Sequence, residues 1–483
     1  MKLSKLLSAL DISISVSDRE IETLTENPSI ATKNSLFVCI RGARANGHDF
    51  APTAYENGCR VFVCSEPLTL PTDAQIFSVL DTRVALAKLA AQFYGHPSKA
   101  IRVVGVTGTK GKTTVASLCQ QVLSASGIPC GYIGTNGVFY AKKSLALKNT
   151  TPDPITLQRT LRDMANEGMQ AVILEVSSQA VYQSRIEGLE FEACIFTNLY
   201  SDHVGPSEHP SFDHYKACKH RLFTDYPCKT MICNADDPHT SDMRTNARAK
   251  RVIEYSMQRD SADFYAQNAL PTLNQYGYGI SFLLNHAYPV SLSLLGKFNA
   301  SNALAVLAVA SECFQISLER AICALSQAHV TGRTETVKLK SGAYAVVDYA
   351  HNGESLSKLL SALREYKPRR LICLFGSVGE RSFLRRREMG DAAARLSDLT
   401  ILTSDNPGKE DPMKIITEIA QSFASVKIPY LTIPDRAEAI RTAVGLAQEG
   451  DILVLAGKGH ENYQLIGNQK LPFSDRNVLE SCN

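Results

Sequence analysis

Short runs of Val, Ile, Leu and Phe alternate with amphipathic segments along most of the chain. Each run is long enough for one buried strand. The runs are residues 34–40, 60–64, 102–108, 170–176, 192–198, 229–234, 343–349, 370–375, 399–404 and 451–457. Apolar residues at helical spacing predict helices at about 354–365, 385–396, 412–423 and 435–448. This alternation is typical of α/β domains built on largely parallel sheets.

Two breaks in the pattern divide the chain. One is Tyr94-Gly95-His96-Pro97-Ser98 and the other lies near Thr331-Gly332-Arg333. A chain of 483 residues is long enough for about three domains. We therefore expect three α/β domains, which span residues 1–98, 99–331 and 332–483. Ligands of such sheets bind at the carboxyl ends of the strands, where the polar motifs of this chain lie.

Composition narrows the class of protein. The net charge is +3, from 51 basic and 48 acidic residues without a run of one sign, so we expect no nucleic-acid partner. The 13 cysteines form no CxxC pair and have no histidine cluster beside them, which favours a reduced, cytoplasmic protein over a disulfide scaffold or a zinc site. No signal peptide and no apolar run of about 18 residues is found, so no membrane span is expected.

The strongest local motif lies between an apolar strand and a helix. It comprises Gly108, Thr109, Lys110, Gly111, Lys112, Thr113 and Thr114. Glycines let backbone amides curl around phosphate oxygens, Lys112 would meet the β- and γ-phosphates, and Thr113 would bind Mg²⁺. Gly105 lies one residue too far from Gly111 for a Walker A loop. A simple glycine-rich turn, a GTPase and a kinase all remain open at this point.

Further motifs follow along the chain. They are Thr150-Thr151-Pro152, Glu175-Val176-Ser177-Ser178, Thr197-Asn198-Leu199, Asp202-His203, Tyr215 with Lys219, Asn234-Ala235-Asp236-Asp237, Gly296-Lys297-Phe298-Asn299, Gly332-Arg333-Thr334-Glu335, Asp348-Tyr349-Ala350-His351, Asp405-Asn406-Pro407 and Gly457-Lys458-Gly459-His460-Glu461. With the phosphate loop, this ordered set resembles the Mur ligase family over roughly residues 20–465. Four of these motifs are similar to those of its MurE branch: TTP, EVSS, DNP and GKGHE.

The resemblance implies a fold and a reaction. The three domains would be a UDP-binding domain, a P-loop ATPase domain and a Rossmann-like domain for the amino acid. ATP would activate a carboxylate of UDP-MurNAc-L-Ala-D-Glu as an acyl phosphate, and the amine of a diamino acid would then displace phosphate. The expected cofactors are ATP and Mg²⁺, and the expected state is a monomer. A folylpolyglutamate-type ligase and a non-catalytic nucleotide-binding protein are the rival interpretations.

The resemblance also assigns metal ligands and catalytic residues. Together with Lys112, the set is Thr113, Glu175, His203 and Lys219, the last as a carbamate that would bind a second Mg²⁺. From the residues alone, Glu175 could instead cap a helix or form an ion pair. Spacing alone would make Lys219 a solvated helix lysine.

The remaining candidates fall into three groups. Besides the phosphate loop, those for ATP are Asn299, Arg333, Asp348 and His351. Those for the UDP substrate are Asn27, Thr150, Thr151, Ser177, Gln183 and Arg185. Those for the amino acid are Arg381, Asp405, Asn406, Gly457 and Glu461. From the residues alone, Arg333 could form a surface ion pair, and Asp348 or His351 could cap a helix.

Departures from the family pattern bear on the amino acid. Asn27 replaces the usual serine at the UDP site, and Gln179 replaces a histidine. MurE enzymes that add meso-diaminopimelate carry DNPR, whose arginine grips the distal carboxylate, whereas this chain has Gly408 there. We therefore expect L-lysine, and the alternatives are meso-diaminopimelate, for which Lys409 could substitute for the arginine, and ornithine.

Overall fold

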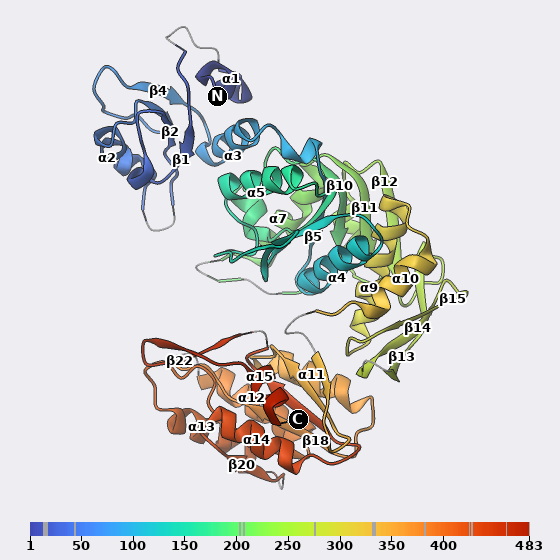
Figure 1. Ribbon diagram of the computed structural model, residues 1–483. Coiled ribbons are helices and arrows are strands. Elements are labelled where there is room, and N and C mark those ends of the chain that lie inside the picture. The colour runs from blue at the N-terminus through green and yellow to red at the C-terminus, as the bar shows by residue number, and fades with distance from the viewer. Residues whose placement is uncertain are drawn as a thin grey trace. The chain divides into compact units, whose positions relative to one another are not determined.

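The structure is a computed structural model that describes residues 1–12, 18–42, 45–201, 204–205, 208–274, 277–330, 335–380, 383–424, 426, 428–459 and 461–482. It divides into two compact units. The first comprises Met1–Phe264 with Leu304–Ala321, and the second comprises Tyr265–Ala303 with Ile322–Asn483. Both units combine helices with sheets, as Figure 1 shows by colour along the chain. The predicted α/β class is confirmed, and the three domain boundaries stay predictions.

A small parallel sheet begins the first unit. Its strands, in spatial order, are β1 (Thr23–Thr25), β2 (Ser35–Val38), β3 (Val61–Cys64) and β4 (Gln75–Ser78), and its helices are α1 (Leu3–Leu7), α2 (Ala51–Glu56) and α3 (Thr82–Phe93). Successive residues of β2 and β3 point to opposite faces, and both faces are buried. Val38 and Val63 pack toward Leu86 of α3, while Phe37 and Phe62 pack toward α2.

A larger sheet forms the rest of the first unit. In spatial order its strands are β12 (Arg251–Ser256), β11 (Cys228–Asn234), β10 (Phe191–Phe196), β5 (Arg102–Thr107), β9 (Ala171–Glu175), β6 (Cys130–Gly134), β7 (Gly137–Tyr140) and β8 (Lys143–Leu145). The first six run parallel, and β7 and β8 are antiparallel. Because β5 lies between β10 and β9, the segment after β5 emerges between the carboxyl ends of its two neighbours.

Helices cover this sheet. They are α4 (Lys112–Ala125), α5 (Pro154–Asn166), α6 (Ser178–Tyr182), α7 (Phe212–Thr224) and α8 (Thr240–Arg244). Two later helices, α9 (Phe298–Ala308) and α10 (Leu318–Gln327), are divided between the two units. Leu161 of α5 and Leu222 of α7 share one core cluster with Val172 and Phe196 of the strands. The predicted strands at 102–108, 170–176, 192–198 and 229–234 are confirmed to within a residue or two.

The second unit contains an antiparallel meander that the sequence did not predict. Its strands are β13 (Phe264–Asn274), β14 (Gly277–Leu284) and β15 (Tyr288–Leu292). Tyr278 of β14 packs edge-on against Tyr344 and Tyr366, at ring-centroid distances of 4.9 Å in both cases. The run from Ile280 to Leu284 is apolar except for Ser281, but Pro271 in β13 and Pro289 in β15 are residues that central strands rarely contain.

The remaining sheet of the second unit has six strands. In spatial order they are β16 (Glu335–Lys338), β17 (Tyr344–Asp348), β21 (Ile452–Ala456), β18 (Leu371–Phe375), β19 (Leu399–Leu402) and β20 (Tyr430–Thr432), all parallel except β16. The helices α11 (Gly353–Arg364), α12 (Phe383–Leu396) and α13 (Pro412–Ala420) pack on one face, and α14 (Arg436–Leu446) and α15 (Asp475–Cys482) on the other. The predicted helices of this region are confirmed. A hairpin of β22 (Tyr463–Ile466) and β23 (Gln469–Pro472) follows β21.

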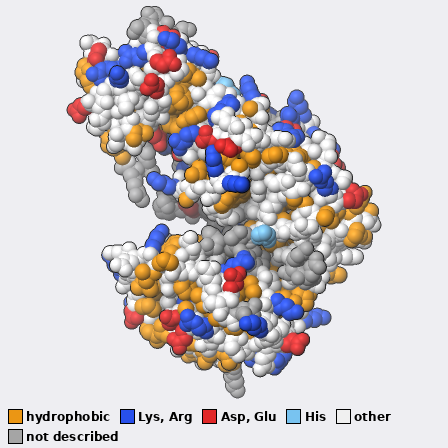
Figure 2. Space-filling model, in the orientation of Figure 1, with side chains coloured by type: hydrophobic (Ala, Val, Ile, Leu, Met, Phe, Trp, Pro, Cys, Tyr) orange, Lys and Arg blue, Asp and Glu red, His pale blue; other side chains and the backbone are white. Residues whose placement is uncertain are grey.

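Three features of the surface and composition can be described from the structure. Among the described residues, no helix combines the length and apolarity that crossing a bilayer requires. Basic and acidic side chains are interspersed on the face drawn in Figure 2. All 13 cysteines are free thiols, and all but Cys323 and Cys482 are buried.

Candidate active site

The phosphate loop has a backbone that its glycines make possible. Gly108 has φ +150° and Gly111 has φ +86°, and α4 begins at the next residue, Lys112. A Cβ atom at Gly108 would lie 1.9 Å from Oγ1 of Thr197, so no larger residue fits there. The first turn of α4 therefore points its unpaired amide groups and positive dipole end toward the loop, as anion binding requires.

The segment after β10 braces this loop. Thr197 donates from its hydroxyl to the carbonyl of Lys110 at 2.7 Å. The side-chain oxygen of Asn198 accepts from the amide of Lys110 at 2.8 Å, and its carbonyl accepts from the amide of Thr109 at 2.9 Å. The predicted TNL motif thus holds the phosphate loop in shape, a role that spacing alone did not reveal.

Glu175 ends β9 directly beside the loop and is fully buried. Its Oε2 accepts from the hydroxyl of Thr113 at 3.0 Å and from that of Thr135 at 3.2 Å. Its Oε1 accepts from the amide of Thr135 at 3.0 Å and from the hydroxyl of Tyr132. The helix-cap alternative for Glu175 is wrong, because Ser177 caps α6. A buried carboxylate beside a hydroxyl is an oxygen donor set that suits a hard cation such as Mg²⁺.

Two lysines converge on the carbonyl oxygen of Gly108. Nζ of Lys112 donates to it at 2.8 Å and also to the carbonyl of Thr109 at 3.1 Å. Nζ of Lys219, on α7, donates to the same carbonyl at 2.9 Å. Lys219 is 1% exposed and lies 4.6 Å above the ring of Tyr215. Its interpretation as a solvated helix lysine is therefore wrong.

A hydrogen-bonded network joins most of the candidates for the UDP substrate. Thr151 donates to the backbone carbonyl of Glu175 at 2.8 Å and to the hydroxyl of Ser177 at 3.3 Å. Arg185 donates to the carbonyl of Thr151 at 2.8 Å and to the side-chain oxygen of Gln183 at 2.7 Å. The structure thus brings these four predicted residues together beside the phosphate loop.

The other two UDP candidates lie at the edge of this network. Oγ1 of Thr150 lies 3.1 Å from Oγ1 of Thr135. Asn27 is exposed, and its side-chain oxygen accepts from the amide of Ser29, so it caps a short 3₁₀ turn. Burial lowers the pKa of Arg185, while the carboxylates of Asp153 and Glu26 act in the opposite direction. Glu26, the residue before Asn27, therefore interacts electrostatically with Arg185 of the network.

The second unit gathers the candidates for the amino acid at the carboxyl ends of β19 and β21. The amide of Asn406 donates to Glu461 at 3.0 Å. Gly457 has φ +114°, and a Cβ atom there would lie 2.5 Å from Oδ2 of Asp405. Lys458, which sequence reasoning did not select, is fully buried and donates to Asn406 at 3.0 Å and to Glu461 at 2.9 Å.

A buried ion pair supports these strand ends. Arg436 and Asp475 are both fully buried and form two hydrogen bonds, of 2.7 and 2.6 Å. Arg436 also donates to the carbonyls of Ser404 and Ala456, the residues next to Asp405 and Gly457. Burial raises the pKa of Asp405, which Arg436 and Lys458 partly counteract. Nothing in the sequence pattern marked this pair, because its partners are 39 residues apart.

The remaining nucleotide candidates of the described residues lie in the second unit. Asn299 is buried and donates to the carbonyl of Leu295 at 2.7 Å. Asp348 ends β17 and accepts from the amide of Ala350, and His351 follows it. Asn352 caps α11, so neither Asp348 nor His351 is that helix's cap. The predicted residues His203, Arg333 and Arg381 lie outside the described residues.

Comparison with known families matches three successive parts of the chain. Residues 30–94 match the Mur ligase family catalytic domain, 106–310 the Mur ligase middle domain, and 332–459 the Mur ligase glutamate ligase domain. The chain is 37% identical over 476 residues to the UDP-N-acetylmuramoyl-L-alanyl-D-glutamate--2,6-diaminopimelate ligase of Geobacillus kaustophilus, covering 96% of this chain and 95% of that protein. The ligase of the same name from Clostridium botulinum is 35% identical over 490 residues, 99% of each chain.

The chain belongs to the Mur ligase family. The predictions that it is an ATP-dependent ligase of MurE type and that it has the three-domain Mur ligase fold are confirmed. A solved 2,6-diaminopimelate ligase matches this Mur ligase with a TM-score of 0.76 at 28% identity, over 100% of this chain and 99% of that one. The folylpolyglutamate synthase of Mycobacterium tuberculosis matches with a TM-score of 0.59 at 16% identity, over 78% of this chain and 92% of that one, and shows a common fold alone.

Proposed function

We propose that this Mur ligase joins meso-diaminopimelate to UDP-N-acetylmuramoyl-L-alanyl-D-glutamate, with conversion of ATP to ADP and phosphate. The substrate carboxylate takes the γ-phosphoryl group to form an acyl phosphate, and the incoming amine then forms the amide bond and releases phosphate. The observation that carries the proposal is the centre formed by Thr113, Glu175 and Lys219 around the phosphate loop. The hydroxyl of Thr113 binds the buried carboxylate of Glu175, and the buried Lys219 binds the loop carbonyl of Gly108.

Each candidate residue around the phosphate loop has a proposed role. Lys112, which contacts two carbonyls of the loop, is proposed to donate to the β- and γ-phosphate oxygens. Thr113 and Glu175 supply oxygen ligands for Mg²⁺, and His203 completes the set that the resemblance implies. Bound Mg²⁺ supplies charge neutralisation for the phosphate oxygens. The network of Thr151, Ser177, Gln183 and Arg185 positions the UDP substrate.

Lys219 is proposed to act as a carbamate. A buried lysine beside a metal site would repel the cation, whereas a carbamate is an anionic oxygen ligand for a second Mg²⁺. A carbamate keeps one N–H at Nζ, so the bond to the carbonyl of Gly108 can persist after the modification. The 1% exposure of Lys219 also shields the modified group from water.

The proposed amino acid differs from the L-lysine that the sequence predicted. The curated relatives are named for 2,6-diaminopimelate, and this favours the alternative over lysine. Gly408, where other diaminopimelate ligases carry arginine, has φ +59°, and a Cβ atom there would lie 3.2 Å from Oε2 of Glu380. We propose that the neighbouring Lys409, which is exposed, contacts the distal carboxylate instead.

The specificity is tested by measuring kcat/KM for meso-diaminopimelate, L-lysine and L-ornithine side by side. We expect a preference for meso-diaminopimelate of at least tenfold, about 1.4 kcal/mol in transition-state binding. Lys409→Ala should lower that preference without lowering turnover of L-lysine. Lys414→Ala, an exposed lysine five residues further on, is the matched control. A tenfold preference for L-lysine would overturn the assignment and leave the ligase activity standing.

We further propose that the enzyme acts in the cytoplasm as a monomer. The buried free cysteines support a reducing compartment, where such thiols persist. Size-exclusion chromatography with light scattering measures the oligomeric state, and a stable dimer would contradict this part of the proposal.

A further inference from the structure

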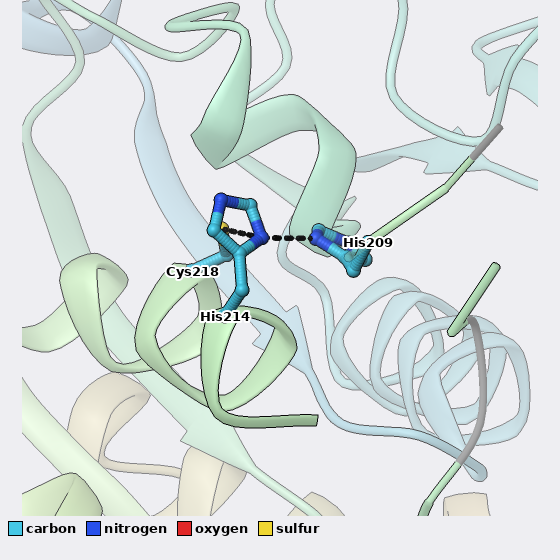
Figure 3. A group of neighbouring side chains, drawn as sticks. All are labelled: His209, His214 and Cys218. Atoms are coloured by element: carbon cyan, nitrogen blue, oxygen red, sulfur yellow. Dashed lines mark hydrogen bonds between the residues drawn. The ribbon is translucent and has the colours of Figure 1, made fainter. Parts of the chain in front are cut away.

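Two histidines and a cysteine meet beside α7, although the sequence favoured no zinc site. They are His209, His214 and Cys218, whose ligand atoms all lie within 4.8 Å of one another. Nδ1 of His209 lies 2.9 Å from Nδ1 of His214, and Sγ of Cys218 lies 3.8 Å from the latter atom. Figure 3 shows a ring nitrogen of His209 facing one of His214, with the thiol of Cys218 behind the His214 ring.

The fold explains why these side chains converge. Ser211 caps α7, so the helix starts in a fixed register at Phe212, three residues after His209. His214 and Cys218 are four residues apart on α7 and therefore share one face of the helix. His209 approaches that face from the preceding segment. His209 and Cys218 are buried and His214 is half-buried, so the cluster has one side open to solvent.

A neighbour of His209 fixes which of its nitrogens faces the cluster. Nε2 of His209 lies 2.8 Å from the hydroxyl of Ser178 on α6, and 3.4 Å from the side-chain amide of Gln179. Metal binding through Nδ1 requires the tautomer in which Nε2 carries the proton and donates to Ser178, and in that tautomer the 3.4 Å contact with the amide nitrogen of Gln179 is not a hydrogen bond. Outer hydrogen bonds of this kind are what orient metal-binding histidines in known sites.

We propose that His209, His214 and Cys218 form a binding site for a borderline-soft divalent ion such as Zn²⁺. With Zn–N and Zn–S bonds of about 2.1 and 2.3 Å, a tetrahedral site needs roughly 3.3 Å between nitrogens and 3.6 Å between nitrogen and sulfur. The observed 2.9 and 3.8 Å differ from these values by about 0.4 and 0.2 Å, and the third pair, His209 and Cys218, lies within 4.8 Å, so side-chain rotations must bring these two ligands closer together. Water takes the fourth position on the open side.

The ligand atoms of this site differ from those of the proposed Mg²⁺ site. Two imidazoles and a thiolate select zinc-like ions, whereas Mg²⁺ prefers oxygen ligands. On binding, Cys218 loses its thiol proton to solvent, and both histidines bind through neutral Nδ1. The ion would tie the segment before α7 to that helix, one residue from the catalytic Lys219.

The test uses the full-length protein, freed of metal with a chelator and carrying no histidine tag. Co²⁺ is titrated as a spectroscopic probe, with Mg²⁺ in excess, and Zn²⁺ then competes for the site. We expect one Co²⁺ per chain, with a thiolate-to-cobalt charge-transfer band in the near ultraviolet. Cys218→Ser should abolish that band, and His214→Asn should weaken Co²⁺ binding at least tenfold. Ser178→Ala should weaken binding by about tenfold, as loss of an outer hydrogen bond does at other metal sites.

Two matched controls come from the same chain. Cys323→Ser removes the exposed cysteine, and His220→Asn removes a histidine on α7 that bonds to the carbonyl of Thr245 instead. Both variants should bind Co²⁺ as the wild type does. Circular dichroism shows whether each variant is folded. If Cys218→Ser unfolds, Co²⁺ binding by His214→Asn decides the question, because His214 is half-exposed. Absence of stoichiometric binding in the wild type, or an unchanged band in folded Cys218→Ser, would overturn the site.

Discussion

The Oγ1 hydroxyl of Thr113 donates a 3.0 Å hydrogen bond to Oε2 of Glu175. This bond joins the first turn of α4 to the end of β9, across 62 residues of sequence. It marks the place where the phosphate loop meets the carboxylate of the neighbouring strand. Both oxygen atoms are proposed Mg²⁺ ligands, and the bond holds them close enough to share one cation.

Removing the hydroxyl of Thr113 should therefore impair the reaction. We expect Thr113→Val to lower kcat by about a hundredfold, because an oxygen ligand of the Mg²⁺ that neutralises the phosphate charge is lost. Phosphate release measured against Mg²⁺ concentration should show a raised metal requirement. Thr113→Ser keeps the hydroxyl and should retain most of the activity, and equal loss in both variants would contradict the role assigned to it.

Lys112→Ala should abolish ATP-dependent ligation, with a loss on the order of a hundredfold or more in rate, since the phosphate charge loses its partner. Lys142→Ala, which changes an exposed lysine in a turn, serves as the control. Isothermal titration with ATP separates lost binding from lost chemistry. Near-normal turnover of the Lys112 variant would refute the phosphate-loop assignment.

Lys219→Ala should lose activity that short-chain carboxylic acids partly restore, because they supply the anion that the carbamate would provide. The comparison is Lys216→Ala on the same helix, whose side chain pairs with Asp242 near the surface. That variant should stay active and should not respond to the acids. Intact-mass evidence for an unmodified Lys219 in a fully active enzyme would count against the carbamate.

The free energy of unfolding of the second unit should fall in acid, because Glu410 becomes protonated. Hydrogen bonds from Arg386 lower the pKa of Glu410 from 4.5 to about 2. A depressed carboxyl pKa stabilises the folded state above the unfolded value, and this contribution fades as pH falls from 4.5 toward about 2. In Tm measurements from pH 6 downward, Glu410→Gln should be less stable than wild type at pH 6, with the gap closing below pH 4.5.

The exposed Glu449→Gln is the control and should track the wild type at every pH. A stability gap between Glu410→Gln and wild type that stays constant across this range would show that the carboxylate's charge is not involved.

Much of the fold was accessible from sequence, because parallel strands buried on both faces are continuous apolar runs. The strand ending at Glu175 was found in this way, and Gly108 and Gly111 were found in the motif that follows an apolar strand. The meander from Phe264 to Leu292 was missed although β14 is apolar, since Pro271 and Pro289 count against strands on either side of it. Single-sequence patterns detect local periodicity, and this meander depends on pairing between its neighbours.

Burial of charged groups was the other part that the sequence did not reveal. Lys219 and Lys458 resemble ordinary surface lysines by spacing, yet both are buried. The partner of Lys219 is the carbonyl of Gly108, 111 residues away, and no local pattern encodes that contact. The family resemblance supplied Lys219 as a candidate, whereas Lys458 and the pair of Arg436 and Asp475 became visible only in the folded chain.

The central claim is ligation through an acyl phosphate, and isotope transfer tests it most directly. UDP-N-acetylmuramoyl-L-alanyl-D-glutamate carrying a heavy oxygen isotope in its free carboxyl groups is incubated with ATP, Mg²⁺ and meso-diaminopimelate. The account predicts the UDP-linked tripeptide, ADP and one phosphate per bond formed, with one heavy oxygen transferred to the phosphate. Phosphate release without the tripeptide, or phosphate free of the isotope, would contradict it.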